Sequence, residues 1–204
     1  MIQLVDLEIL QTYKIKQHLS KMKVLIFAGT LETGPNSTSS RLSEYLVNKL
    51  QTEKIETQLF TLNNAGIPLL DTLLEETPPG VQAMLDIFLG ADAHIWLAPL
   101  YHGSIPGVMK NCLDWLELSA DYSKPYLSEK IIGFISWADG MQAMKGIDTM
   151  DAVAKSLRAW SLPYSIPIMK SELYSKPDFE NIAVKYSEKL DLMVKLITQK
   201  RKFY

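Results

Sequence analysis

Hydroxyl-bearing residues are concentrated in one short segment, AGTLETGPNSTSSRL (28–42), which leads into a helical pattern. The first turn of a helix presents free main-chain N–H groups and a partial positive charge, so this segment suits a phosphate group. An ordinary N-cap in a polar loop explains the same residues equally well. Because GxxxxGK[ST] and GxGxxG are both absent, a mononucleotide phosphate is favoured over P-loop or dinucleotide binding. The candidate residues are Gly29, Thr30, Ser37, Ser39 and Ser40.

Two further segments combine turn-forming residues with side chains that could contact a planar ligand. The first, APLYHGSIPGVMKNCLDW (98–115), is rich in proline and glycine, which bring main-chain amides close to a ligand. The second, SWADGMQ (136–142), follows another apolar run. Each residue alone is more often a turn or core residue, but three such segments together favour a ligand site. The candidates are Pro99, Leu100, Tyr101, His102, Gly103, Ser104, Ser136, Trp137, Gly140 and Gln142.

Alternating strand and helix patterns would position these segments. Short apolar runs predict strands over 24–29, 57–61, 94–99, 131–136 and 164–169, although prolines weaken the last. Apolar residues at three- and four-residue spacing predict helices over 41–50, 81–89, 106–118 and 141–162, and a final helix after 178. The third helix is expected to bury Val108, Cys112, Trp115 and Leu116, and the fourth to carry Met150, Val153, Leu157 and Trp160 on one face.

This alternation predicts an α/β fold in which a five-stranded parallel sheet carries helices on both faces. In such folds ligands bind outside the carboxyl ends of the strands, which is where the three segments lie. The length of 204 residues fits one domain, assigned to 22–204. Residues 1–21 form an extension, which is an added helix, a partner-binding segment or a consequence of where translation was assigned to start.

Composition excludes several function classes. The net charge of -2 gives no general attraction to nucleic acid or anionic lipid. The longest apolar stretches, 93–100 and 131–136, are far shorter than the roughly 20 residues that cross a bilayer. Cys112 is the single cysteine, which fits a reducing compartment and favours the cytoplasm. Acidic residues do not recur with histidine at metal-ligand spacing, so no metal site is expected.

The stretch PLYHGSIPGVMKNCLDW (99–115) resembles the NADPH-dependent FMN reductases of flavodoxin-like fold, which include flavin, quinone, azo-dye and chromate reductases. It matches the pattern Pro-x-Tyr-x-x-Ser-x-Pro-Gly-x-Leu-Lys-Asn-x-x-Asp-Trp of that family, with Met109 in place of leucine. The resemblance spans about 23–169. It implies a three-layer sandwich with strand order 2-1-3-4-5, FMN as the cofactor and NADPH or NADH as the electron donor. It also implies a homodimer or a dimer of dimers.

The resemblance assigns roles to the three segments. Residues 99–104 would contact the isoalloxazine ring through main-chain amides, and the first loop would hold the FMN phosphate. Glu32 stands where the family usually has arginine, and Trp137 replaces a small residue. Hydride would pass from the nicotinamide to flavin N5, then electrons to a quinone, free flavin, azo compound or metal oxyanion. No catalytic side chain is required, because the flavin supplies the chemistry.

Two alternatives remain open at this point. One is a non-enzymatic electron carrier or redox-sensing FMN-binding protein, although carriers are typically more acidic than a net charge of -2. The other is that FMN exchanges freely as a substrate. Among single residues, His102 is equally a ligand contact or an exposed turn residue, and His94 is expected to be packed or to lie at the strand edge. Cys112 is expected in the core, and Lys110 and Asp114 are spaced to form an ion pair.

Overall fold

The computed structural model describes residues 22–32, 34–175 and 181–199. The extension predicted at 1–21 therefore lies outside the described residues. In chain order the elements are β1 (Lys23–Ala28), α2 (Thr38–Thr52), β2 (Glu56–Thr61), α3 (Pro79–Gly90), β3 (Ala93–Pro99), α4 (Gly107–Asp114), η1 (Trp115–Ser119), β4 (Ile131–Ala138), η2 (Met141–Ala143), α5 (Met144–Ser156), β5 (Trp160–Met169), η3 (Lys170–Glu172) and α6 (Val184–Thr198).

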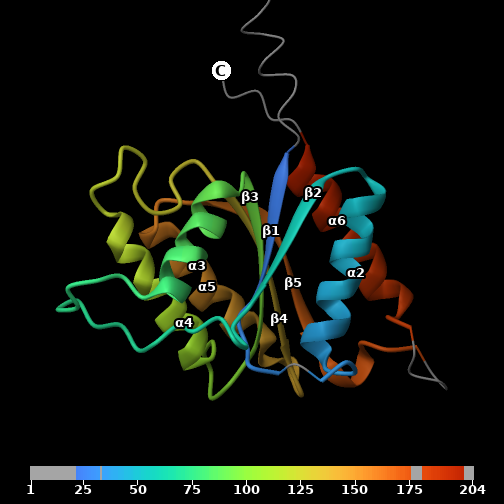
Figure 1. Ribbon diagram of the computed structural model, residues 1–204. Helices are drawn as coiled ribbons and strands as arrows, with labels where there is room; N and C mark the ends of the chain where they lie inside the picture. Colours follow the sequence, from blue (N-terminus) through green and yellow to red (C-terminus); the bar gives the residue numbers. More distant parts are fainter. Residues whose placement is uncertain (1–21, 33, 176–180, 200–204) are drawn as a thin grey trace, which may run out of the picture.

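The five strands form one sheet in the order β2-β1-β3-β4-β5, and every pairing is parallel. Helices α2 and α6 cover one face, and α3, α4 and α5 cover the other (Figure 1). The predicted α/β sandwich and its strand order are confirmed. Strand order reverses between β1 and β3, so the chain leaves these neighbouring strands toward opposite faces, which is where ligands bind in such sheets.

Alternate residues of the central strands supply two separate cores. In β1, Val24 and Ile26 pack under α2 and α6, whereas Leu25 and Phe27 pack under α3 and α4. Strand β3 is buried along its whole length. A strand that is apolar on both faces must be covered twice, and this is why the run reads as continuously apolar instead of alternating. The two cores hold the ends of β1 and β3 rigidly.

The helix predicted over 141–162 is too long. Helix α5 ends at Ser156, and Arg158 adopts a left-handed conformation with φ 63°. The N–H of Ala159 then donates to Ala154 O at 3.0 Å and that of Arg158 to Lys155 O at 3.0 Å, which is a Schellman ending built without glycine.

Residues 160–162 belong to the last strand. The N–H of Trp160 donates to Lys130 O at 2.8 Å, which starts the pairing of β5 with β4. The Trp160 side chain is 60% exposed, so its predicted place on a buried helical face is wrong. Prolines at 163 and 167 are tolerated because β5 is an edge strand, and Pro163 lies at the irregularity opposite Gly133.

The helix predicted over 106–118 is divided into α4 and the 3₁₀ helix η1, and its packing differs from prediction at one residue. Cys112, Trp115 and Leu116 are buried as predicted, but Val108 is 38% exposed, so its prediction as a core residue is wrong. Val108 lies in the first turn of α4, where it lines a cavity. None of the helices in the described ranges is long and apolar enough to cross a membrane.

Candidate functional site

The three predicted segments leave neighbouring strands at the same edge of the sheet. Strand β1 passes into the first at Gly29, whose N–H donates to Leu97 O of β3 at 2.8 Å. Strand β3 passes into the second at Leu100, whose N–H donates to Trp137 O of β4 at 2.8 Å. Main-chain bonds between strands therefore fix the starting points of the first two loops.

The close approach of Gly29 to α4 accounts for glycine at this position. A Cβ atom built on Gly29 would lie 2.6 Å from Met109 Cγ and 3.0 Å from Met109 Cβ. Met109 is fully buried, so it has little room to move. Any side chain at position 29 would push α4 away from the end of β1.

The hydroxyl-rich segment forms the N-terminus of α2. Ser37 is the N-cap: its Oγ accepts from the N–H of Ser40 at 3.1 Å and donates to Ser40 Oγ at 2.9 Å. No main-chain or side-chain group among the described residues accepts a hydrogen bond from the N–H of Thr38 or of Ser39. The first turn of α2 carries no acidic residue. This helix start thus offers free N–H groups and neutral hydroxyls, which suits an anion.

Two cavities adjoin this loop and share Thr30 and Glu32 in their lining. One, of about 470 Å³, lies between the start of α2 and the end of β2, and includes Ser39, Ser40 and Ser43. The other, of about 630 Å³, lies toward α4 and includes Tyr101, His102, Ile105 and Val108. Ser43, which lines the first cavity, is buried, and its Oγ has no hydrogen-bond partner among the described residues. A buried hydroxyl without a partner is uncommon, and a bound polar group would satisfy it.

Residues 101–104 form a tight turn after β3. The N–H of Tyr101 donates to Ser104 O at 2.9 Å, and that of Ser104 donates to Tyr101 O at 3.0 Å. The two central residues have positive φ, 50° at His102 and 85° at Gly103. The N–H groups of Leu100, Tyr101 and Ser104 are therefore bonded, and Pro99 has no N–H group. Among the described residues, none accepts from the N–H groups of His102 and Gly103.

Tyr101 links the first and second loops. Its ring is 48% exposed, and its hydroxyl donates to Glu32 Oε1 at 3.0 Å. Partial burial, then the hydrogen bond to Glu32 and its negative charge, raise the pKa of Tyr101 above the ordinary value. The phenol therefore stays protonated at neutral pH and continues to donate.

The third loop presents a different arrangement. Ser136 is fully buried and its Oγ has no partner. Trp137 is 2% exposed and packs in the core beneath α2 and α6, so its side chain faces away from the edge and its main chain carries the link to Leu100. Gln142 is exposed, and Gly140 lies beside its side chain. Neither of the two cavities at the first loop includes a residue of this segment.

The profile of one protein family matches most of the described chain: the family "NADPH-dependent FMN reductase", over residues 22–171. The chain belongs to this family. Membership makes it an NAD(P)H-dependent oxidoreductase with FMN as the cofactor. The FMN-dependent NADPH-azoreductase of Staphylococcus aureus is 27% identical over 162 residues, which cover 77% of this chain and 82% of that protein.

Solved structures of this FMN reductase fold agree with the architecture. FerB, a flavoenzyme NAD(P)H:(acceptor) oxidoreductase from Paracoccus denitrificans, superposes with a TM-score of 0.69 at 20% identity, covering 86% of this chain and 94% of its own. A putative quinone reductase from Klebsiella pneumoniae gives a TM-score of 0.63 at 17% identity, covering 88% and 86%. At these identities the likeness supports the flavodoxin-like fold.

The residues of this FMN reductase chain fit the cofactor. The helix start supplies free N–H groups with the hydroxyls of Thr30, Ser37, Ser39 and Ser40, and the orphaned Ser43 hydroxyl lies in the adjoining cavity. The turn at 101–104 supplies two further free N–H groups. No group of three or more His, Cys, Asp or Glu in the described ranges is arranged to hold a metal ion.

Sequence reasoning missed several residues that line the site. Ser43 follows Ser39 by four positions on α2, so helical spacing alone could have placed it on the same face. Ile105 and Val108 carry no chemical signal and line the cavity only because α4 starts there. Glu32 stands out in the sequence only as a departure from the family pattern, yet it lines both cavities.

Asn111 and Trp115 of the family stretch have a clear structural role. The side chain of Asn111 accepts from Leu70 N–H at 2.8 Å and donates to Pro68 O at 2.7 Å. The indole N–H of Trp115 donates to the same carbonyl at 2.9 Å. Lys110 and Asp114 form the predicted surface ion pair. This part of the stretch therefore anchors the loop before α3 to α4.

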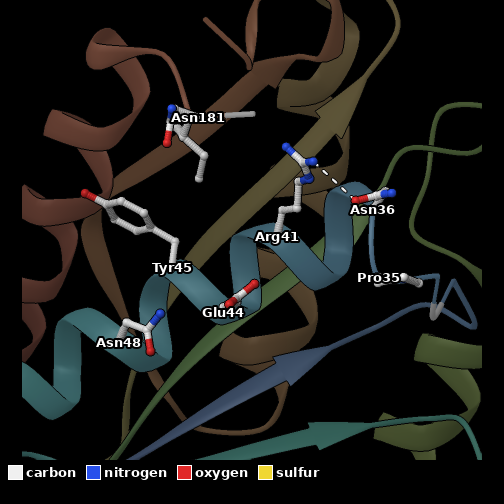
Figure 2. Close-up of a pocket in the computed structure, with 8 residues that line it drawn as sticks. Pro35, Asn36, Arg41, Glu44, Tyr45, Asn48 and Asn181 are labelled. Atoms are coloured by element: carbon white, nitrogen blue, oxygen red, sulfur yellow. Dashed lines mark hydrogen bonds between the residues drawn. The ribbon is translucent and has the colours of Figure 1, made fainter. Parts of the chain in front are cut away.

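Arg41 lies on another side of α2. Its guanidinium donates to Asn36 Oδ1 at 3.3 Å and lies 5.0 Å above the Tyr174 ring. Figure 2 shows Arg41 and its bond to Asn36 in a third cavity of about 330 Å³, with Glu44, Tyr45 and Asn181 around it, and this cavity shares Pro35 and Glu44 with the 470 Å³ cavity. Arg41 is the sole basic residue between positions 24 and 48. It lines neither of the two cavities that adjoin the first loop.

Two buried groups outside the site were predicted correctly as core residues. The Cys112 thiol is fully buried beside Met84, and burial raises its pKa, so it is not a nucleophile at neutral pH. His94 is also fully buried, with Nε2 3.0 Å from Phe88 O and Nδ1 accepting from the Trp96 indole at 3.3 Å. A neutral ring protonated on Nε2 satisfies both contacts.

Proposed function

We propose that this protein uses NADPH or NADH to reduce bound FMN and passes the electrons to a small-molecule acceptor. The observation that carries the proposal is the convergence, at one sheet edge, of an uncharged anion-binding helix start and a tight turn with two free N–H groups. The acceptor is a quinone, free flavin, azo compound or metal oxyanion. Azo reduction is the activity in the name of the Staphylococcus aureus relative.

The first loop is proposed to hold the phosphate of FMN. Free N–H groups of Thr38 and Ser39 point out of the start of α2, and the hydroxyls of Thr30, Ser37 and Ser40 surround them. Gly29 allows the loop to begin close to α4. These donors act without a positive side chain, since none lines the two adjoining cavities among the described residues.

The second and third loops are proposed to hold the flavin ring. Within residues 99–104, the N–H groups of His102 and Gly103 are the ones free to bind ring oxygen or nitrogen atoms. Ser136, Gly140 and Gln142 belong to the opposing loop, to which Trp137 contributes main-chain atoms. N–H donors close to the ring stabilise the negative charge that it gains on reduction.

When bound, FMN supplies the redox chemistry by accepting hydride at N5 and giving up electrons afterwards. No acidic or basic side chain is required as a catalyst. The protein orients the ring, keeps one face open and positions the donor and the acceptor there in turn. We therefore expect ping-pong kinetics. The 630 Å³ cavity is walled by Leu31, Tyr101, Ile105 and Val108, which favours a planar, largely apolar acceptor such as a quinone or azo compound.

The working form is proposed to be a homodimer, or a dimer of dimers, in the cytoplasm. Leu69 and Leu73 are 83% and 88% exposed in the loop that Asn111 and Trp115 hold against α4. Apolar side chains held in an ordered loop are typical of a surface that a second subunit covers. The single, buried cysteine is consistent with a reducing compartment.

Steady-state kinetics test the proposal. The flavin-loaded protein is assayed for NADPH and NADH oxidation with a benzoquinone, an azo dye, free FMN and chromate as separate acceptors. Double-reciprocal plots at several acceptor concentrations should give parallel lines for at least one acceptor. Intersecting lines would contradict the proposal that the two substrates use one face in turn, and absence of turnover with all four would contradict the enzymatic function.

A further inference from the structure

The electrostatic character of the first loop has a consequence for which flavins the protein accepts. Both cavities that adjoin the loop are lined by Glu32, and the 470 Å³ cavity is also lined by Glu44. No lysine or arginine lines either cavity in the part of the chain that the structure describes. Any anion placed at the start of α2 is therefore held by neutral donors, with carboxylates of its own sign nearby.

Glu32 is held at this position. The Tyr101 hydroxyl donates to its carboxylate at 3.0 Å, and the N–H of Glu32 donates to Thr30 Oγ1 at 3.2 Å. Thr30 is itself buried. The side chain thus stays at the junction of the two cavities, where the hydroxyl-rich helix start meets the turn at 101–104.

Arg41 is the basic residue closest in sequence to the first loop, and it does not offset the negative charge of these carboxylates. Arg41 lies one turn along α2 but donates to Asn36 and lies over the Tyr174 ring, in the cavity of Figure 2, which shares Pro35 and Glu44 with the 470 Å³ cavity. A phosphate monoester carries a charge of about -1.5 to -2 at pH 7. Its attraction to the helix start is offset by repulsion from the carboxylates of Glu32 and Glu44, which line the same cavity as Ser39 and Ser40.

We infer that Glu32 is the residue that removes selectivity for the flavin phosphate, so that the protein accepts riboflavin about as well as FMN. The inference rests on the proposed function, because it takes the flavin to occupy this edge. Its independent support is the hydroxyl of Ser43, a buried polar group that lines the 470 Å³ cavity and has no hydrogen-bond partner among the described residues. With little affinity coming from the phosphate, the flavin exchanges with solution and serves as a substrate as well as a cofactor.

Flavin binding, measured without turnover, tests this inference. Quenching of flavin fluorescence gives the dissociation constants of FMN and riboflavin for the full-length protein and for Glu32→Gln. In the wild type the two constants should agree within about threefold. In Glu32→Gln, FMN should bind about tenfold more tightly, because the repulsion is removed. Riboflavin should change less than twofold, since it carries no charge.

The matched control is Glu53→Gln, which removes a carboxylate at the opposite end of α2. It should leave both constants unchanged, and circular dichroism should show that both variants fold. Wild-type protein that prefers FMN by 30-fold or more, or a Glu32→Gln variant with an unchanged ratio, would overturn the inference while leaving the reductase intact. Failure of every protein to bind either flavin would instead overturn the proposed function, and the inference with it.

Discussion

The residues at the sheet edge contribute hydrogen bonds and positions more than chemical reactivity of their own. Tyr101 donates to Glu32, His102 and Gly103 contribute free main-chain N–H groups, and Ser37 caps a helix. The buried Cys112 and His94 lie outside both cavities of the first loop. The residues of this site bind and orient, which is the contribution that a flavin enzyme requires from its protein.

Gly29 tests the close approach between β1 and α4. Gly29→Ala should lower the free energy of unfolding by about 1–3 kcal/mol, because its new Cβ would overlap buried Met109. Urea denaturation measures the change. Gly90→Ala is the control: nothing lies within 4 Å of the Cβ position of that helical residue, so the variant should be neutral or slightly stabilised. Equal destabilisation of both variants would contradict the packing argument.

Because His94 is buried, the free energy of unfolding should depend on pH. Burial, followed by the charge of Lys130, lowers the pKa of His94 to about 3, although its hydrogen bond to Phe88 opposes this. In the unfolded chain the pKa is about 6.5, so the unfolded state binds a proton that the folded state excludes. The stabilisation is complete above pH 6.5 and declines as the pH falls toward 3.

Urea denaturation at pH 7 and pH 5 measures this effect. The free energy of unfolding should fall by about 2 kcal/mol over that interval because of His94. Most of the loss should disappear in His94→Gln, whereas His102→Gln should keep it, because His102 is exposed in a turn. A wild-type stability that is flat between these pH values would show that His94 is protonated in the folded protein.

Secondary-structure elements determine where the free donors lie. Helix α2 starts at the end of β1, so its first-turn N–H groups point to the sheet edge, and Ser37 fixes where that turn begins. Helices α2 and α6 are joined by Asp191, which accepts from Tyr45 at 2.8 Å and pairs with Lys49 at 2.8 Å. Burial, together with Asp191, raises the pKa of Tyr45 to about 12, so this link persists through the neutral range.

Substitutions at Ser37 separate the capping role from the binding role. Ser37→Ala should cost about 1 kcal/mol of stability, because the cap to Ser40 N–H is lost. Ser37→Asp retains an N-cap oxygen and should keep near wild-type stability. The added charge should nevertheless weaken FMN binding about tenfold and leave riboflavin binding unchanged. Thermal melts and fluorescence titration measure the two effects, and unaltered FMN binding in Ser37→Asp would place the phosphate elsewhere.

Much of the fold could be predicted, because its strands and helices depend on patterns of residues that lie close together in the sequence. Buried parallel strands read as apolar runs, and amphipathic helices repeat every three or four residues, so the sequence predicts the α/β sandwich. The end of α5 was not predictable, because Arg158 takes the left-handed position that a glycine usually marks. Lys54 ends α2 in the same way, with φ 60°.

The site was predictable only in part. Helix-start chemistry and turn residues mark the loops, but which N–H groups remain free depends on distant partners. Leu100 N–H is used by Trp137 O, 37 positions later in the chain, and sequence spacing cannot indicate such a bond. The outward position of Arg41 likewise depends on Tyr174.

At the scale of the whole molecule, the sheet edge is rigid and the adjoining surface is apolar. Bonds from Asn111 and Trp115 hold the carbonyl of Pro68, so Leu69 and Leu73 are displayed at a fixed place beside α4. Figure 1 shows this loop on the α3 and α4 side of the sheet, away from α2 and α6. A surface of this kind is expected to be covered in the working protein.

Oligomeric state tests the proposed dimer. Sedimentation velocity at micromolar concentration should give a dimer or a larger even-numbered assembly for the wild type. The double variant Leu69→Asp, Leu73→Asp should sediment as a monomer, because charge in a buried apolar interface is unfavourable. Val184→Asp changes an exposed apolar residue of α6 and should leave the assembly intact. A monomeric wild type would refute the proposed dimer.

The central claim, that this protein accepts hydride on a bound flavin, is tested most directly without an acceptor. The FMN-loaded protein is mixed anaerobically with one equivalent of NADPH or of NADH, and the oxidised-flavin absorbance is followed for seconds. The absorbance should be bleached within that time by at least one of the two donors. Flavin that remains bound and oxidised with both donors would contradict the account and leave an electron carrier or a redox sensor as the function of this fold.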